Sequence, residues 1–213
     1  RHRPVEAREG ELMSQQNSSS KRFWLRNPEK ADLNQYWYSE GTLQALVQEL
    51  VMSGCQHVAF LSTPSVFFSL PEDTPPRLGS FLFDLDEKWS GLPAFVRYDF
   101  NDPTGFTGVD AGSCDGFVID PPFITQEVWE KYAETVRHLA TRDPDTQKIS
   151  AKIVASTIPE NAPFMEELLG VRACPFKPSI PHLVYQYCFY TNYQPSEQAL
   201  GCPNPEIPDE EED

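Results

Sequence analysis

The chain has 213 residues, of which 39% are hydrophobic and 12% aromatic, enough for one globular domain with a proper core. No apolar run reaches the ~18 residues needed to span a bilayer, and the first residues lack the apolar segment of a secretory signal. The formal net charge of −15 opposes binding to nucleic acid, because that affinity depends on Lys and Arg that neutralise phosphates. A basic protein partner suits this charge better.

The cysteines indicate the redox environment. Cys55, Cys114, Cys174, Cys188 and Cys202 are widely separated, and none belongs to a Cys-x-x-Cys pair. A zinc site is therefore not expected, and the odd number argues against a disulfide framework. We predict a reducing compartment, the cytoplasm, with no bound metal and with cysteines that are mostly buried or inert.

Both ends of the sequence are predicted to lie outside the domain. Residues 1–22 are polar and poor in bulky hydrophobic side chains, which is typical of a flexible tail. Residues 196–213 form an acidic, Pro-rich tail whose end, "PNPEIPDEEED", we expect to be solvated and mobile. This tail either attracts a basic partner or only keeps the protein soluble. The domain is expected over residues 23–195, acting as a monomer.

Helical and strand patterns alternate along this domain. In chain order they predict a helix over 39–54, strands over 57–62, 80–86, 94–100 and 115–120, a helix over 125–140, a strand over 148–157, a short helix over 161–170, and final strands over 171–176 and 183–193. The first helix has Ser39 as a possible N-cap and Gly54 as its stop. The two final strands have little between them and should form an antiparallel hairpin.

This order of elements predicts an α/β fold. Five strands joined by helices or long crossovers, then a hairpin, give a mainly parallel, doubly wound seven-stranded sheet with an antiparallel C-terminal hairpin. That arrangement resembles the general plan of the class I (Rossmann-like) methyltransferases.

Polar or turn-forming residues follow each of the first four strands. They are Ser62, Thr63, Pro64 and Ser65 after the first strand, Asp84 and Asp86 after the second, Asp99 and Asn101 after the third, and Asp120, Pro121, Pro122 and Phe123 after the fourth. Each alone can be an ordinary turn residue. Because ligands of open α/β sheets bind at the carboxyl ends of the strands, their recurrence there favours a binding site.

The residues after the first two strands restrict the type of ligand that this site can bind. A carboxylate at Asp84 or Asp86 can accept hydrogen bonds from the hydroxyls of a ribose. The first loop, "FLSTPSVFF", has no glycine, although the pyrophosphate of a nicotinamide dinucleotide normally needs a Gly-rich turn. A ligand without phosphates, such as S-adenosylmethionine, remains compatible with this loop.

The fourth group can hold a nitrogen atom for methylation, a reaction that needs a lone pair aimed at the methyl group. Asp120 can accept a hydrogen bond from the target N–H, and the carbonyl of Pro121, fixed in direction by the proline rings, can accept another. Phe123 can pack against a flat base or an alkylammonium stem. The alternative is a rigid turn that ends a strand. We favour the nitrogen site, because Asp-Pro-Pro-aromatic is a rare chance sequence even with 20 prolines.

The same residues carry a family resemblance. Asp120 to Phe123 resembles motif IV of the amino-methyltransferases, which include N6-adenine methyltransferases. "NQYWYS" (34–39) resembles a segment of one branch, and "TPSVFF", "FLFDLDEKW", "FVRYDFNDP", "FVIDPPF" and "ELLGVRACPFKP" follow in the same order and at similar spacing. That branch, first labelled N6-adenine methyltransferase-like, is known as a family of protein-lysine methyltransferases of translation elongation factor 1 alpha. The resemblance covers about residues 30–193.

The resemblance implies a cofactor, S-adenosyl-L-methionine, and a role for each site residue. It places Gln35, Tyr38 and Ser39 over the methionine end of the cofactor, Ser62, Thr63, Pro64 and Ser65 in the first cofactor loop, Asp84 or Asp86 on the ribose, Asp99 and Asn101 beside the adenine, and Asp120, Pro121, Pro122 and Phe123 on the substrate amine. The segment 35–39 can also be interpreted as a hydrophobic staple before the helix.

Three functions follow from these observations. The resemblance and the acidic charge favour an S-adenosylmethionine-dependent protein-lysine N-methyltransferase acting on the elongation factor. The alternative is an adenine N6-methyltransferase, which would flip a base of RNA or DNA into the same pocket. No Lys/Arg-rich stretch or aromatic-basic platform supports that alternative. The third is a binding module without activity, against which the intact Asp-Pro-Pro-Phe argues.

Overall fold

The structure is a computed structural model that describes residues 23, 25–30 and 35–208. Its strands are β1 (Val58–Leu61), β2 (Phe81–Asp84), β3 (Phe95–Arg97), β4 (Gly116–Ile119), β5 (Lys152–Thr157), β6 (Arg172–Ala173) and β7 (Cys188–Thr191). Its helices include α2 (Glu40–Ser53), α3 (Pro64–Ser69), α4 (Pro75–Leu78), α5 (Gln126–Leu139) and α6 (Ala162–Leu169), with 3-10 turns η2 (Glu87–Trp89) and η3 (Pro159–Asn161). The predicted strands and helices are all present.

The strands form one seven-stranded sheet in the order β3-β2-β1-β4-β5-β7-β6. β1 to β5 are parallel, whereas β7 runs antiparallel to both β5 and β6. The predicted mainly parallel sheet with an antiparallel C-terminal pair is thereby confirmed. The strand order reverses direction between β1 and β4, and ligands of open α/β sheets bind at such a switch point.

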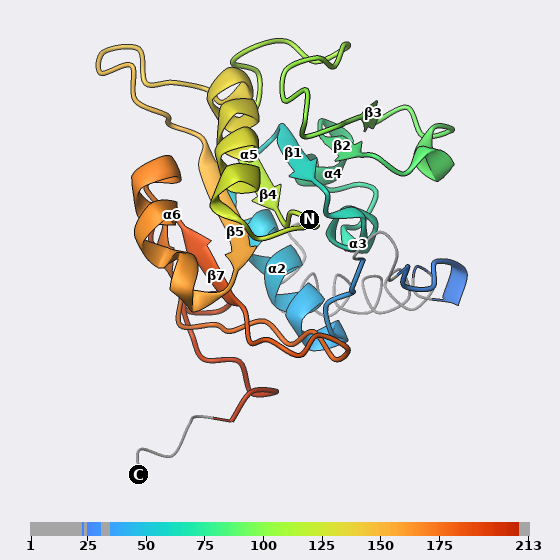
Figure 1. Cartoon of the computed structure of the whole chain (residues 1–213), viewed down its shortest axis with the longest axis vertical. Helices are drawn as coiled ribbons and strands as arrows, with labels where there is room; N and C mark the ends of the chain where they lie inside the picture. The colour runs from blue at the N-terminus through green and yellow to red at the C-terminus, as the bar shows by residue number, and fades with distance from the viewer. Residues whose placement is uncertain (1–22, 24, 31–34, 209–213) are drawn as a thin grey trace, which may run out of the picture.

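Helices cover both faces of the sheet (Figure 1). Successive strand residues point to opposite faces, so in β1 Ala59 and Leu61 enter one core and Val58 and Phe60 the other. The first core is completed by α5 and α6, and the second by α2 and α3. Continuous apolar strands are therefore explained by burial on both sides.

The first helix forms where the sequence places its caps. The Ser39 hydroxyl accepts a hydrogen bond from the backbone N–H of Thr42 at 3.1 Å, and Gly54 ends α2 in the left-handed conformation at φ 76°. Both devices satisfy backbone groups that a helix end leaves without partners.

Two local features differ from the predictions. The segment after β1 was expected to be a loop, but Pro64 starts the short helix α3, because its fixed φ suits a first helical turn. β6 and β7 were expected to have little between them, yet residues 174–187 separate them. We call residues 174–187 the β6–β7 connector.

Part of the C-terminal segment differs from its prediction, because residues 196–204 are anchored on the domain by buried contacts. The buried carboxylate of Glu49 accepts hydrogen bonds from the N–H groups of Ser196 at 3.0 Å and Leu200 at 3.3 Å. The Asn204 side chain is buried and donates to the carbonyl of Lys177 at 2.8 Å. The predicted tails at 1–22 and 209–213 lie outside the described residues.

The cysteines are all free thiols, and four of the five are buried. Burial raises the pKa of Cys114 and Cys174 to about 11, so these thiols stay protonated at neutral pH. Among the described residues, no helix has both the length and the apolar character to cross a membrane.

Candidate active site

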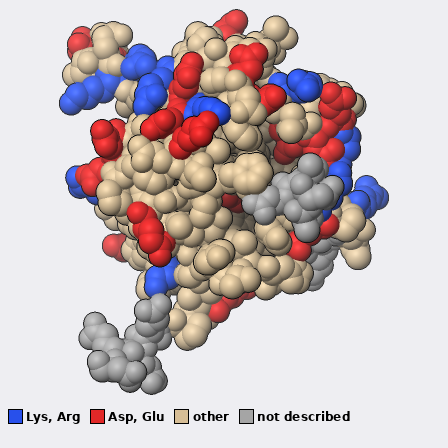
Figure 2. Space-filling view, viewed as in Figure 1, with Lys and Arg blue, Asp and Glu red and all other residues tan. Residues whose placement is uncertain are grey.

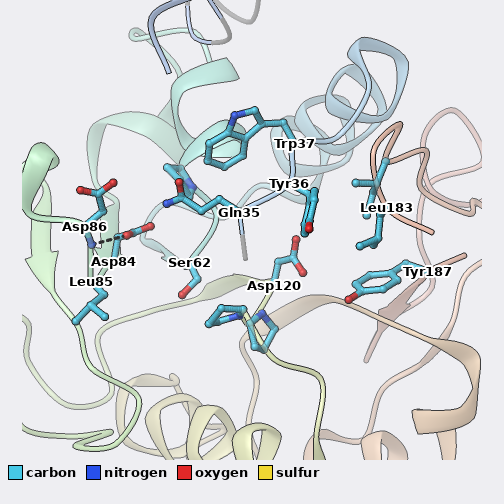
Figure 3. Close-up of a pocket in the computed structure, with 14 residues that line it drawn as sticks. Gln35, Tyr36, Trp37, Ser62, Asp84, Leu85, Asp86, Asp120, Leu183 and Tyr187 are labelled. Atoms are coloured by element: carbon cyan, nitrogen blue, oxygen red, sulfur yellow. Dashed lines mark hydrogen bonds between the residues drawn. The ribbon is translucent and has the colours of Figure 1, made fainter. Parts of the chain in front are cut away.

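A pocket opens at the carboxyl ends of β1, β2 and β4 (Figure 3). The segment before α2 and the β6–β7 connector form its other walls. Its lining residues are Gln35, Tyr36, Trp37, Ser62, Pro64, Asp84, Leu85, Asp86, Asp120, Pro121, Pro122, Ile180, Leu183 and Tyr187. In Figure 3, Asp84, Leu85 and Asp86 lie on one side and Leu183 and Tyr187 on the other, with Asp120 between them.

Asp120 is the carboxylate at the centre of this pocket, directly after β4. Its backbone N–H donates to the carbonyl of Leu61 at 3.2 Å, and its Oδ2 accepts a hydrogen bond from the Tyr38 hydroxyl at 2.7 Å. Burial raises the pKa of Asp120 to about 7, although the hydrogen bond from Tyr38 acts in the opposite direction. The carboxyl group can therefore gain or lose a proton near neutral pH.

The charge of this carboxylate contributes to raised pKa values at two tyrosines. Burial and then the charge of Asp120 raise the pKa of Tyr38 and of Tyr187, so both keep their protons. Tyr187 comes from the β6–β7 connector, and Figure 3 shows its ring beside Asp120. Tyr38 does not line the pocket but contacts it through Asp120.

The residues after Asp120 separate into two groups. Pro121 and Pro122 line the pocket. Phe123, predicted to pack on the substrate amine, is 53% exposed and meets the ring of Phe100 edge-on at 6.4 Å between centroids. It is not among the residues that line the pocket.

The two carboxylates after β2 both line the pocket but have different surroundings. Asp86 binds Lys30 at 2.9 Å and Lys88 at 3.2 Å. Burial raises the pKa of Asp86, but these lysines outweigh it and the pKa is lowered. Asp84 is buried, its Oδ1 accepts from the N–H of Asp86 at 2.8 Å, and burial raises its pKa to about 6. Asp84 has no ion-pair partner within the described residues.

In the loop after β1, a serine adopts the backbone conformation that usually requires glycine. Ser62 has a φ of 59°, in the left-handed region that favours glycine. Its hydroxyl bonds the Tyr132 hydroxyl at 2.7 Å and its N–H donates to the carbonyl of Phe83 at 2.8 Å. Ser62 and Pro64 line the pocket, whereas Thr63 and Ser65, predicted in the same loop, are buried and do not line it.

The segment before α2 contributes more than predicted. Gln35, predicted to contact the cofactor, lines the pocket, and its Oε1 is buried without a hydrogen-bond partner in the part of the chain that the structure describes. Tyr36 and Trp37 also line it. Ser39 does not, because its hydroxyl faces the start of α2 and bonds Thr42 and Glu206.

The residues after β3 are not brought to the pocket. Asp99 Oδ1 accepts from the backbone N–H of Asn101 at 2.9 Å, and Asn101 Oδ1 accepts from Lys131 Nζ at 3.1 Å. Neither residue lines the pocket. Their hydrogen bonds are those of turn residues, and their predicted position beside an adenine stays a prediction.

Six lining residues were not predicted. Tyr36 and Trp37 lie within the quoted "QYWYS", and Leu85 lies between the two predicted aspartates, so proximity could have indicated them. Ile180, Leu183 and Tyr187 belong to the β6–β7 connector and had no sequence signal. Glu29 ties this connector to the segment before α2, since its carboxylate accepts from the N–H of Trp37 at 2.9 Å and contacts His182 Nδ1 at 2.6 Å.

The sheet order, with an acidic residue at the end of β2 and a pocket over the switch point, defines the class I methyltransferase fold. The sequence profile of the family described as "Probable N6-adenine methyltransferase" matches residues 29–195. The chain therefore belongs to this family.

Several known proteins are similar to this chain. EEF1A lysine methyltransferase 1 from Homo sapiens is 31% identical over 179 residues, covering 82% of this chain and 78% of that protein. A protein-lysine N-methyltransferase from Dictyostelium discoideum is 32% identical over 178 residues, covering 81% and 80%. Among solved structures, a predicted O-methyltransferase from Agrobacterium tumefaciens is similar at 9% identity, with a TM-score of 0.46 over 69% of this chain and 78% of that one.

Proposed function

We propose that this protein is an S-adenosylmethionine-dependent protein-lysine N-methyltransferase that acts on translation elongation factor 1 alpha in the cytoplasm. The observation that carries the proposal is the central carboxylate of Asp120, bonded to Tyr38 and followed by two pocket-lining prolines. The similarity to named lysine methyltransferases selects the substrate class, and the net charge of −15 suits a basic partner.

The residues on one side of the pocket fit the cofactor. The buried Oε1 of Gln35 lacks a donor among the described residues and would accept a hydrogen bond from the ammonium group of S-adenosylmethionine. Asp84, which has no ion-pair partner there, would hold the ribose hydroxyls, whereas Asp86 is already bound by two lysines. When bound, S-adenosylmethionine supplies a methyl group on a positively charged sulfur.

The other side of the pocket prepares the amine. A lysine ammonium has a pKa near ~10.4 and no lone pair, so it must lose a proton before it can attack. The apolar walls at Ile180, Leu183 and Tyr187 disfavour its charge and lower that pKa. Asp120, as a carboxylate, accepts a hydrogen bond from an N–H of the neutral amine and thereby orients its lone pair.

An adenine N6-methyltransferase is the second candidate, because the matched family carries that description. A base would have to be flipped out of its stack to reach the same pocket. Figure 2 shows Asp and Glu in several regions of one face and no continuous field of Lys and Arg. This charge distribution and the −15 total favour the protein substrate.

The proposal is tested by incubating the protein with tritium-labelled S-adenosylmethionine and a whole-cell lysate, and by following the transfer of label into the lysate. Label that survives RNase, disappears with protease and runs at the mass of the elongation factor is expected. Label that RNase or DNase removes would establish the adenine activity instead. Cofactor binding without any transfer would indicate a binding module that has lost its activity.

Asp120→Ala tests the central residue directly. We expect this variant to bind the cofactor as the wild type does and to transfer no methyl group. Asp99→Ala is a matched control, since Asp99 also follows a strand of the sheet but lies outside the pocket, and it should retain transfer. Normal turnover by Asp120→Ala would refute the assignment.

A further inference from the structure

Several exposed apolar side chains line the pocket or are next in sequence to residues that line it. Seven large hydrophobic side chains are exposed in the described residues, and four of them lie in or beside the pocket lining: Leu85 (52% exposed), Phe123 (53%), Val184 (92%) and Tyr185 (69%). Leu85 itself lines the pocket, Phe123 directly follows the lining prolines, and the other two lie between lining residues of the β6–β7 connector. Leu85 and the connector belong to opposite sides of the pocket in Figure 3.

Of the other three exposed hydrophobics, Leu25 lies before the described segment 35–208, and Met52 and Leu78 lie away from the pocket. Met52 is at the last turn of α2, the end farther from the pocket, and Leu78 ends α4 before the start of β2. Single exposed hydrophobics of this kind are normal on protein surfaces. Several of them around one pocket are not, and such groups mark sites of interaction.

The β6–β7 connector presents its two apolar side chains from a defined conformation. The N–H of Leu183 donates to the carbonyl of Ile180 at 3.0 Å, and the Gln186 side chain donates to the carbonyl of Pro178 at 2.9 Å. His182 Nδ1 contacts the carboxylate of Glu29, which precedes α2, at 2.6 Å. The connector is thus held by contacts within itself and by Glu29, while Val184 and Tyr185 are exposed.

We propose that Leu85, Phe123, Val184 and Tyr185 form a docking surface for the protein that carries the target lysine. This inference rests on the proposed function and specifies its substrate as a protein whose lysine projects beside an apolar patch on a basic surface. Under the proposed function the pocket receives only the lysine side chain of the partner, which many proteins carry, so the energy that selects one protein must come from contacts around the pocket. The net charge of −15 attracts a basic surface, and the four apolar side chains supply the short-range contact.

This surface fits a protein better than a nucleic acid. Val184 and Leu85 are aliphatic, so they offer no ring on which a base could stack. The charge of the chain repels phosphates. An apolar patch on a protein partner would bury all four side chains, and burial of that kind is the main source of affinity at interfaces.

Val184→Asp tests the docking surface, with Leu78→Asp as the matched control at an exposed site on α4. Both changes add one charge at a highly exposed position, so neither should affect folding. In the complex the carboxylate at position 184 would be desolvated against the partner's apolar patch, and this cost outweighs its attraction to the surrounding basic surface. We expect Val184→Asp to raise KM for purified elongation factor 1 alpha by about tenfold or more, the range of an interface hot spot. Its kcat and its affinity for S-adenosylhomocysteine should remain unchanged, and Leu78→Asp should match the wild type in every measurement.

A binding measurement separates this inference from the proposed function. The affinity of each variant for the elongation factor is measured with S-adenosylhomocysteine present, independently of methyl transfer. Weaker binding by Val184→Asp without any lysine methylation by the wild type would support the docking surface and refute the lysine activity. Methylation of the factor with equal KM and equal affinity for wild type and Val184→Asp would refute the docking surface alone. A wild-type dimer that Val184→Asp dissociates, with factor binding unchanged, would assign the surface to a second copy and overturn the inference.

Discussion

The hydrogen bond from Tyr38 to Asp120 makes a quantitative prediction for the pH dependence of the reaction. The Tyr38→Phe variant loses the donor at 2.7 Å but keeps the ring that packs on Phe189, 5.6 Å away between centroids. A hydrogen bond to a charged group stabilises it by about 1.5–3 kcal/mol. One pH unit corresponds to about 1.4 kcal/mol, so the loss should raise the pKa of Asp120 by about one to two pH units.

The direction of the effect follows from the role of the carboxylate. Asp120 must be deprotonated to accept a hydrogen bond from the amine, so activity falls as the pH drops through its pKa of about 7. In Tyr38→Phe the same decline should occur about one to two pH units higher. Activity at high pH should approach that of the wild type.

The assay is a profile of kcat/KM against pH for methylation of the elongation factor, because kcat/KM reports the ionisation of the free enzyme. Tyr98→Phe is the control, since it removes a buried hydroxyl bonded to Thr135 at 2.7 Å but outside the pocket. It should leave the profile in place. A Tyr38→Phe profile that is lower but not displaced, together with weaker cofactor binding, would refute the reasoning and support the cofactor contact first expected for Tyr38.

Three further predictions concern stability. Ser62→Ala and Ser62→Gly both lose the partly buried hydroxyl contact to Tyr132, but only alanine keeps the left-handed strain at φ 59°. Urea unfolding should therefore find the glycine variant more stable than the alanine variant by about 1 kcal/mol. The pKa of Asp84 is raised to about 6 by folding, so its stabilising contribution is complete below about pH 4 and is lost as the pH rises through 6. Asp84→Asn should therefore be more stable than the wild type by up to about 3 kcal/mol at pH 8 and by little at pH 4, and an equal difference at both pH values in thermal unfolding would contradict this. Glu49→Ala leaves the N–H groups of Ser196 and Leu200 without their acceptor, which should lower the free energy of unfolding by about 1–3 kcal/mol. Residues 196–208 should then become sensitive to limited proteolysis, and unchanged protease resistance would argue against this anchor.

Much of the fold could be predicted from the sequence, because it depends on neighbouring residues. The caps of α2 at Ser39 and Gly54 act within one helical turn, and continuous apolar runs identify buried parallel strands. The positions of Asp84 and Asp120 at the pocket follow from the same pattern, since a residue directly after a parallel strand must lie at the carboxyl edge of the sheet.

The tertiary structure alone decided which strand-end residues meet in the pocket. Asp99 also follows a strand, but β3 is at the edge of the sheet, so the pocket forms over β1, β2 and β4 without it. Ser39 was predicted at the cofactor, but its hydroxyl is used by α2 and by Glu206, a residue far away in the chain. Partners at such separations leave no local pattern in the sequence.

The β6–β7 connector contributes pocket residues that the sequence did not indicate. Tyr187 lies beside Asp120 because β7 inserts antiparallel between β5 and β6 and brings the end of the connector to the carboxyl edge of the sheet. In the sequence its hydrophobic residues have the same appearance as core residues of a strand. Local pattern determined the elements and the aspartates that follow them, whereas long-range packing determined which side chains complete the pocket, because contact across the sheet depends on strand order and not on sequence distance.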